Sequence, residues 1–233
     1  MSFIEFKDVT KEYVIGESKL LAVDHINFGI NEGEFVVILG PSGAGKSTLL
    51  NLLGGMDYAT SGKITIAGTN ITNYKDDELT EYRAHKVGFV FQFYNLIPTL
   101  TALENVTLTK EVTKSAMDPI KVLASVGLQE HTNQFPSQLS GGEQQRVSIA
   151  RAICKNPAML LCDEPTGALD SETGTVILSL LQRLCRENHK TVIIVSHNAA
   201  LAEAADKVIH IKNGRITNVV VNDHPIEVSE VNW

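Results

Sequence analysis

One segment limits more than any other what this chain can fold into. It reads, in order, Gly40, Pro41, Ser42, Gly43, Ala44, Gly45, Lys46 and Ser47. The apolar run 35–39 precedes this G-x-x-x-x-G-K-S pattern, and a leucine-rich stretch with helical spacing follows it. A buried strand, a glycine-rich loop and a helix in this order form the setting that a phosphate-binding loop requires. The segment therefore predicts an α/β fold.

The chemistry of this loop points to a nucleotide. Its glycines let backbone N–H groups turn inward around a β-phosphate, and the helix N-terminus adds partial positive charge. Lys46 would reach the β- and γ-phosphates, and the hydroxyl of Ser47 would bind Mg²⁺. The alternative is a glycine-rich turn that happens to precede a lysine. A phosphate loop alone still leaves kinases, GTPases, helicases and transporters open.

Apolar runs and helical stretches alternate through the second half of the chain. The runs at 87–91, 159–162 and 191–195 predict buried strands, and residues 172–186 and 199–205 predict helices. This alternation favours a mostly parallel sheet, in which functional side chains gather at the carboxyl ends of the strands.

The remaining segments show other patterns. Alternation around residues 3–8 and 22–30, with a short hairpin at 63–71, predicts an N-terminal antiparallel β subdomain. Residues 101–137 contain short helical patterns broken by proline and glycine, which predicts an inserted α-helical lobe. The Asn213-Gly214 pair predicts a final hairpin.

Composition narrows the class of protein. The net charge of −7 argues against a broad nucleic-acid interface, which needs clustered Lys and Arg. No apolar run approaches the roughly 20 residues of a membrane-spanning helix. The three cysteines form no C-x-x-C pair and suit free thiols in a reducing compartment.

Two acids and a histidine are the candidate hydrolytic groups. Asp163 and Glu164 end the apolar run 159–162, so Asp163 could bind Mg²⁺ and Glu164 could polarise an attacking water. His197 follows the run 191–195 and could hydrogen-bond a γ-phosphate. The alternatives are solvated acids at a strand end and a structural histidine.

A second anion site is predicted at residues 139–146, which read LSGGEQQR. Ser140 followed three residues later by Glu143 is a capping box that begins a helix. Gly141 and Gly142 leave the N–H groups of the first helical turn uncovered, as an anion would require. Two phosphate-binding helix ends in one chain make sense if two chains share each nucleotide.

These motifs together resemble those of the ABC-cassette ATPases, and they occur in that family's order over residues 3–216. The resemblance implies that residues 40–48, including Thr48, form Walker A, and that Tyr13 stacks on adenine. It implies ATP and Mg²⁺ as cofactors, with Ser47, Gln92 and Asp163 around the metal and with Lys46, Gln92, Glu164 and His197 as catalytic groups. Ser140, Gly141 and Gly142 match the signature, and Asp170 matches the D-loop.

Residues 91–101 and 162–170 are similar to the MacB/LolD type within this family. That branch implies bacterial origin and a separate permease with a large extracytoplasmic domain. We therefore expect a homodimer in the ATP state, no nucleic-acid partner, and a cytoplasmic protein held peripherally on the inner face of the cell membrane by the permease. We expect the loop 93–100 to form part of the permease groove. The alternatives are a mechanotransmitting or signalling ATPase that controls a transmembrane partner, and a soluble ATPase acting on nucleic acid or ribosomes.

The expected domain organisation follows from this resemblance. Residues 1–233 form a single domain with a P-loop NTPase core at 1–92 and 157–217. The helical lobe with the signature occupies 93–156, and the tail 218–233 carries no usable motif.

Overall fold

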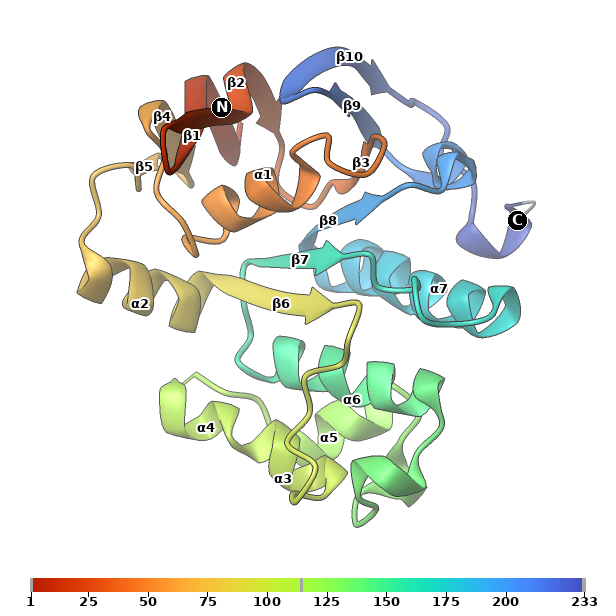
Figure 1. The fold of residues 1–233 in the computed structure, drawn as a ribbon. Coiled ribbons are helices and arrows are strands. Elements are labelled where there is room, and N and C mark those ends of the chain that lie inside the picture. The colour runs from red at the N-terminus through yellow and green to blue at the C-terminus, as the bar shows by residue number, and fades with distance from the viewer. Residues whose placement is uncertain (1, 114, 232–233) are drawn as a thin grey trace.

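Two β-sheets, a set of helices and a helical lobe make up the part of the chain that the computed structural model describes, residues 2–113 and 115–231 (Figure 1). The first sheet is antiparallel and has the order β2-β1-β4-β5. Its strands are β1 Ile4–Ile15, β2 Ser18–Ile30, β4 Ser61–Ile66 and β5 Thr69–Asn70. This sheet confirms the predicted N-terminal antiparallel subdomain.

The second sheet has the order β10-β9-β3-β8-β7-β6 and is parallel except for β10. Its strands are β3 Phe35–Leu39, β6 Val87–Phe91, β7 Met159–Asp163, β8 Thr191–Ser196, β9 Lys207–Lys212 and β10 Arg215–Val221. Leu39 pairs with Ser196, and Asp163 pairs with both Phe91 and Val195. The residues that follow β3, β6, β7 and β8 therefore meet at one edge of the sheet.

The α-helices lie on both faces of the second sheet and in the lobe. They are α1 Lys46–Leu53, α2 Asp76–Lys86, α3 Ala102–Thr107, α4 Thr109–Val112, α5 Pro119–Ser125, α6 Gly141–Cys154 and α7 Ser171–Asn188. Short 3-10 helices cover Gln129–His131, Pro136–Gln138, Ala199–Ala204 and Val228–Glu230.

Two hydrophobic clusters fix the faces of the second sheet. Val36 and Ile38 pack with α1 and the first sheet, whereas Phe35 and Val37 pack with α6, α7 and the lobe. Because both faces of β3 are covered, all of its residues are apolar and buried. The loops before α1 and before α6 therefore belong to opposite sides of the sheet.

Three segments differ from the sequence-based expectation. Helix α2 was not predicted, because only Leu79, Tyr82 and Ala84 of its eleven residues are buried. Residues 199–204 form a 3-10 helix rather than a longer helix to 205. Strand β10 continues through residues 218–221, which the sequence analysis assigns to the tail, because these residues complete the ladder with β9.

The rest of the tail also packs on the core. The side chain of Gln182 on α7 accepts a hydrogen bond from Val228 N at 2.9 Å and donates one to Ile226 O at 2.9 Å. Val228 is fully buried. The tail therefore covers part of α7.

Candidate active site

The phosphate loop takes its shape from glycines at two close approaches. Gly45 has a φ of 100°, and a Cβ there would lie 2.3 Å from the carbonyl oxygen of Ala22. A Cβ on Gly40 would lie 2.3 Å from the carbonyl oxygen of Ile211. Only glycine fits at both places, so β2 and β9 hold the loop between β3 and the first turn of α1.

The loop encloses the ammonium group of Lys46. Its Nζ donates hydrogen bonds to Gly40 O at 2.8 Å and to Pro41 O at 3.1 Å, and the residue is buried. An ammonium group has three donors, so a third remains for an anion above the loop. Positive charge, backbone N–H groups and a helix N-terminus thus converge at one place.

A hydroxyl and a carboxylate form the next part of the site. Ser47 Oγ, on the first turn of α1, donates to Asp163 Oδ1 at the end of β7 at 3.2 Å. Burial raises the pKa of Asp163, while the hydrogen bond from Ser47 opposes this shift. These are oxygen ligands of the kind that Mg²⁺ prefers, and among the described residues no group of three or more His, Cys, Asp or Glu side chains is arranged to hold a metal ion by itself. Such a small donor set fits a magnesium ion that is also held by phosphates and water.

Glu164 and His197 meet at the same sheet edge. His197 Nδ1 lies 2.9 Å from Glu164 Oε2, and the backbone N–H of Glu164 donates to Val195 O at 3.0 Å. Glu164 has a φ of 49°, a left-handed conformation that few residues other than glycine adopt. This turn directs the chain out of β7 and away from the sheet. The sequence predicted both residues but not this pair.

The amide of Gln92 lies against the loop that follows Glu164. A Cβ on Gly167 would lie 2.9 Å from Gln92 Nε2, so the Gln92 side chain lies close against this loop. The sequence analysis missed Gln145, which is fully buried on α6. Its Nε2 donates to Phe91 O at 3.1 Å and to Pro165 O at 2.7 Å, and thereby fixes the strand that carries Gln92 beside that loop. Its only sequence signal was a polar residue on the apolar face of a helix.

Tyr13 lies at the edge of the first sheet and is held from two sides. Its hydroxyl donates to Asp57 Oδ2 at 2.6 Å, and Lys11 Nζ lies 4.8 Å from the centre of its ring. Burial, followed by the hydrogen bond to Asp57, raises the pKa of Tyr13. The phenol therefore stays neutral, and its ring orientation is set before any base binds.

The second predicted anion site is a helix N-terminus as expected. Ser140 N donates to Glu143 Oε2 at 2.7 Å, and Glu143 N donates to Ser140 Oγ at 3.3 Å. These bonds to Ser140 lower the pKa of Glu143. A Cβ on Gly142 would lie 2.4 Å from Thr173 Cγ2, so the first turns of α6 and α7 are in close contact. Asp170 caps α7 by accepting from Thr173 N at 2.9 Å.

The two anion sites of one chain do not face each other. Helix α1 packs on one face of the second sheet, and α6 packs on the other (Figure 1). Ser140 is exposed to solvent, and its side-chain hydrogen bond stays within its own capping box. The structure thus brings the phosphate loop, Asp163, Glu164, Gln92 and His197 to one sheet edge and leaves Ser140 apart from them.

Comparison with known families decides the identity. The family model described as "ABC transporter" matches residues 23–167, a range that contains the phosphate loop, Gln92, the Ser140 helix end and both acids. The chain belongs to the ABC transporter family of ATP-binding proteins. Its activity is ATP hydrolysis, as the resemblance implied.

Several relatives of this ABC protein cover nearly all of it. The uncharacterized ABC transporter ATP-binding protein MJ0796 of Methanocaldococcus jannaschii is 47% identical over 91% of this chain and 94% of the relative. The macrolide export ATP-binding/permease protein MacB of Mannheimia succiniciproducens is 41% identical over 97% of this chain, but over only 36% of its own length. These similarities support the MacB/LolD branch.

The fold of this ABC protein is that of a solved cassette. The dimeric structure of MJ0796 superposes with a TM-score of 0.85 at 45% identity and covers 94% of this chain and 98% of the other. A second structure of MJ0796, a dimeric post-hydrolysis state bound to ADP and Pi, has the same TM-score. Within residues 2–113 and 115–231 of the ABC protein, no helix is both long enough and apolar enough to span a membrane.

Proposed function

We propose that two copies of this ATPase close head to tail around two nucleotides, and that this closure drives a separate membrane permease of the MacB/LolD type. The observation that carries the proposal is the position of Ser140 and Gly142, on the opposite side of the second sheet from the phosphate loop. A second chain is needed to bring such a helix end over a bound γ-phosphate. The dimeric structures of MJ0796 support this arrangement.

One chain supplies the groups that bind the nucleotide and activate the water. Lys46 and the loop N–H groups bind the β- and γ-phosphates, and Tyr13 stacks on adenine. Ser47 and Asp163 would hold Mg²⁺, with Gln92 beside them, and the bound ion would neutralise phosphate charge. Glu164 accepts the proton of the attacking water, and His197, 2.9 Å away, orients that carboxylate beside the γ-phosphate.

The partner's helix end completes the site. The capping box of Ser140 and Glu143 leaves the N–H groups of Gly141 and Gly142 available to the γ-phosphate of the facing chain. Asp170 caps α7, whose first turn contacts α6 at Gly142. Contacts to the γ-phosphate favour the closed dimer, and hydrolysis removes them, so the cycle closes with ATP and opens with ADP.

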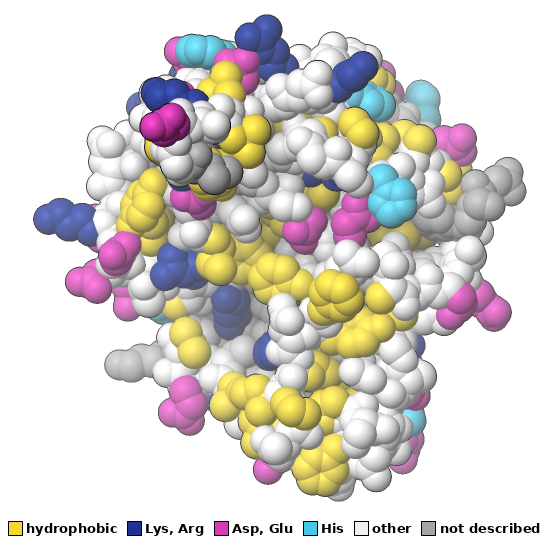
Figure 2. All heavy atoms as spheres, viewed as in Figure 1, with side chains coloured by type: hydrophobic (Ala, Val, Ile, Leu, Met, Phe, Trp, Pro, Cys, Tyr) yellow, Lys and Arg dark blue, Asp and Glu magenta, His cyan; other side chains and the backbone are white. Residues whose placement is uncertain are grey.

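We place the permease groove beside the loop 93–100. Phe93 is 73% exposed and Ile97 is 40% exposed, whereas Leu96 packs on the core. Arg151 donates to Asn95 O at 2.6 Å and so fixes the loop that presents these side chains. Figure 2 shows apolar side chains gathered over the lobe, beside a hollow lined by Lys or Arg side chains. An amphipathic helix of the permease would fit such a surface.

Co-sedimentation tests this placement. When the protein is co-expressed with its permease, it should sediment with membranes, and Phe93→Asp should reduce the membrane-bound fraction about fivefold or more by placing a charge at the contact. ATP binding should be unchanged. The control is Val221→Asp, at a residue 62% exposed on β10, which should sediment fully. Full sedimentation of Phe93→Asp would show that the groove lies elsewhere.

A further inference from the structure

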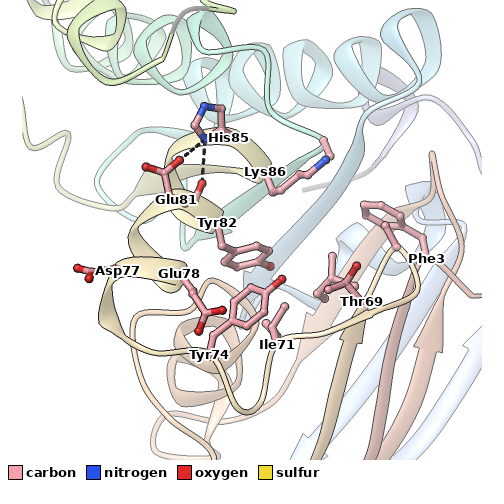
Figure 3. Close-up of a pocket in the computed structure, with 13 residues that line it drawn as sticks. Phe3, Thr69, Ile71, Tyr74, Asp77, Glu78, Glu81, Tyr82, His85 and Lys86 are labelled. Carbon is pink, nitrogen blue, oxygen red and sulfur yellow. Dashed lines mark hydrogen bonds and ion pairs between the residues drawn. The ribbon is translucent and has the colours of Figure 1, made fainter.

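A cavity of about 530 Å³ lies between α2 and the β4–β5 hairpin (Figure 3). None of the residues that the sequence analysis assigned to nucleotide, metal or catalysis lines it. Figure 3 shows aromatic and aliphatic side chains from both elements turned toward the same space. The apolar part of the lining is formed by Phe3, Ile66, Ile71, Tyr74 and Tyr82.

The walls of this cavity are fixed by the fold. Tyr82 is 6% exposed and donates its hydroxyl hydrogen to Leu53 O at 2.7 Å. The N–H of Ala158 donates to Lys86 O at 3.0 Å, which ties the end of α2 to the start of β7. Ala67 N donates to Phe3 O at 2.7 Å, which ties the hairpin to β1. A small molecule would therefore enter a preformed site with little cost for ordering it.

The rim has an excess of negative charge. Asp77, Glu78 and Glu81 line it from α2, against the ammonium of Lys86 and the imidazole of His85. Glu78 uses one carboxylate oxygen to accept from Lys75 N at 2.8 Å, and Glu81 lies 3.4 Å from His85. Asp77 forms no ion pair with any residue that the structure describes.

We propose that this cavity binds a small organic cation with an apolar body. The apolar floor matches a ring or a short alkyl chain. The carboxylates of α2 favour an ammonium group through the negative potential that they add around the rim, since those of Asp77 and Glu81 point away from the aromatic side chains in Figure 3. The volume lies within the range of about 300–1,000 Å³ that small-molecule sites occupy. None of the residues argued for the permease and dimer contacts lines this cavity.

Three probes with one apolar body and different head groups test the site. By calorimetry or NMR titration of the full chain, 4-phenylbutylamine should bind with a Kd on the order of 0.1–1 mM. 4-Phenylbutanol should bind about fivefold more weakly, and 4-phenylbutanoate more weakly still, because the rim carries excess carboxylates. The double variant Asp77→Asn with Glu81→Gln should bring the amine and the alcohol to within about twofold of each other.

A second test of the site fills the cavity with a larger side chain. Thr69→Trp places a large ring at an exposed residue of the lining and should abolish amine binding. Thr65→Trp, on a neighbouring strand and outside the lining, should bind the amine like the unaltered chain. The proposal is overturned if the amine does not bind, if it binds no better than the alcohol, or if Thr69→Trp binds it unchanged. Circular dichroism and ATP binding confirm that each variant is folded.

Discussion

Tyr13 illustrates how a distant segment fixes the orientation of a single side chain. Asp57, 44 residues away in sequence, fixes its hydroxyl, and Lys11 covers one face of its ring. The other face is the one that a nucleobase would cover. Because the ring orientation is already set, stacking should cost little conformational entropy.

Removing this ring should weaken nucleotide binding. Tyr13→Ala should raise the Kd for ATP about tenfold, since base–aromatic stacking contributes about 1–3 kcal/mol. Tyr13→Trp should bind ATP as the unaltered chain does, and both can be measured by fluorescence titration with a labelled nucleotide. An unchanged Kd in Tyr13→Ala would mean that Tyr13 does not contact the base.

The side chain of Lys155 should make the free energy of unfolding depend on pH. Burial, with Arg151 and Arg83 nearby, lowers the pKa of Lys155 to about 8, and its Nζ donates to Arg83 O at 2.7 Å. Between this value and the ordinary pKa of about 10.4, the unfolded chain binds a proton that the folded chain has lost. The free energy of unfolding should therefore rise with pH across this window, by about 1 kcal/mol after allowance for partial exposure.

Urea unfolding at pH 7.5 to 10 measures this contribution, since the approximate window begins near pH 8. In Lys155→Met the rise should be smaller by about 1 kcal/mol, because the titrating group is gone. Lys121→Met removes an exposed lysine on α5 and should keep the rise. If the free energy of unfolding changes with pH equally in the unaltered chain and in Lys155→Met, Lys155 does not contribute the predicted rise.

At the residue scale, the sequence indicated which side chains would lie together where they adjoin buried strands, but it did not indicate contacts that depend on packing. Lys46, Ser47, Asp163 and Glu164 stand beside buried strands in sequence, and the structure gathers them at one sheet edge. Gln145 could not be assigned a role, because its partners Phe91 and Pro165 are far from it in sequence. The Glu164–His197 pair likewise depends on the neighbouring positions of β7 and β8.

At the scale of elements, α6 and α7 are held together at their first turns by a glycine contact. Gly142 faces Thr173 with no room for a Cβ, whereas a Cβ on Gly174 would meet Thr166 at an ordinary 3.5 Å. Alanine can therefore be compared at two helical glycines on adjoining helices, one with room for a Cβ and one without.

We expect the two alanine variants to have opposite effects on stability. Gly174→Ala should raise the free energy of unfolding by about 0.5–1 kcal/mol, because alanine favours the helix and fits. Gly142→Ala should lower it by about 1–3 kcal/mol and reduce ATPase activity, because Thr173 must move. Urea unfolding and a phosphate-release assay measure both, and a stabilised, fully active Gly142→Ala would contradict the packing described.

Elements with a clear hydrophobic pattern in the sequence were predicted accurately, whereas elements without such a pattern were not. The bounds of β3 and β6 agree with the sequence because their residues are apolar on both faces. Helix α2 is mostly exposed and polar, so neither its helical period nor its cavity could be recognised before the β4–β5 hairpin was placed against it.

At the scale of the whole molecule, the central point is that one chain holds two candidate anion sites on opposite sides of one sheet. The sequence predicted both sites, and the structure supplied their separation. If the proposed function is correct, the chain alone cannot enclose a γ-phosphate, and the nucleotide itself joins two copies. ATP should then control the oligomeric state, and Glu164 should control how long the closed state lasts.

Size-exclusion chromatography of Glu164→Gln tests this claim most directly. The amide keeps the size of the carboxylate but cannot accept a proton, so the variant should bind ATP and lose most turnover. With saturating Mg-ATP it should elute as a dimer, with ADP as a monomer, and with Ser140→Arg added it should stay monomeric in ATP. Elution of Glu164→Gln as a monomer in Mg-ATP, at a protein concentration of about 100 μM or more, would contradict the shared-site account.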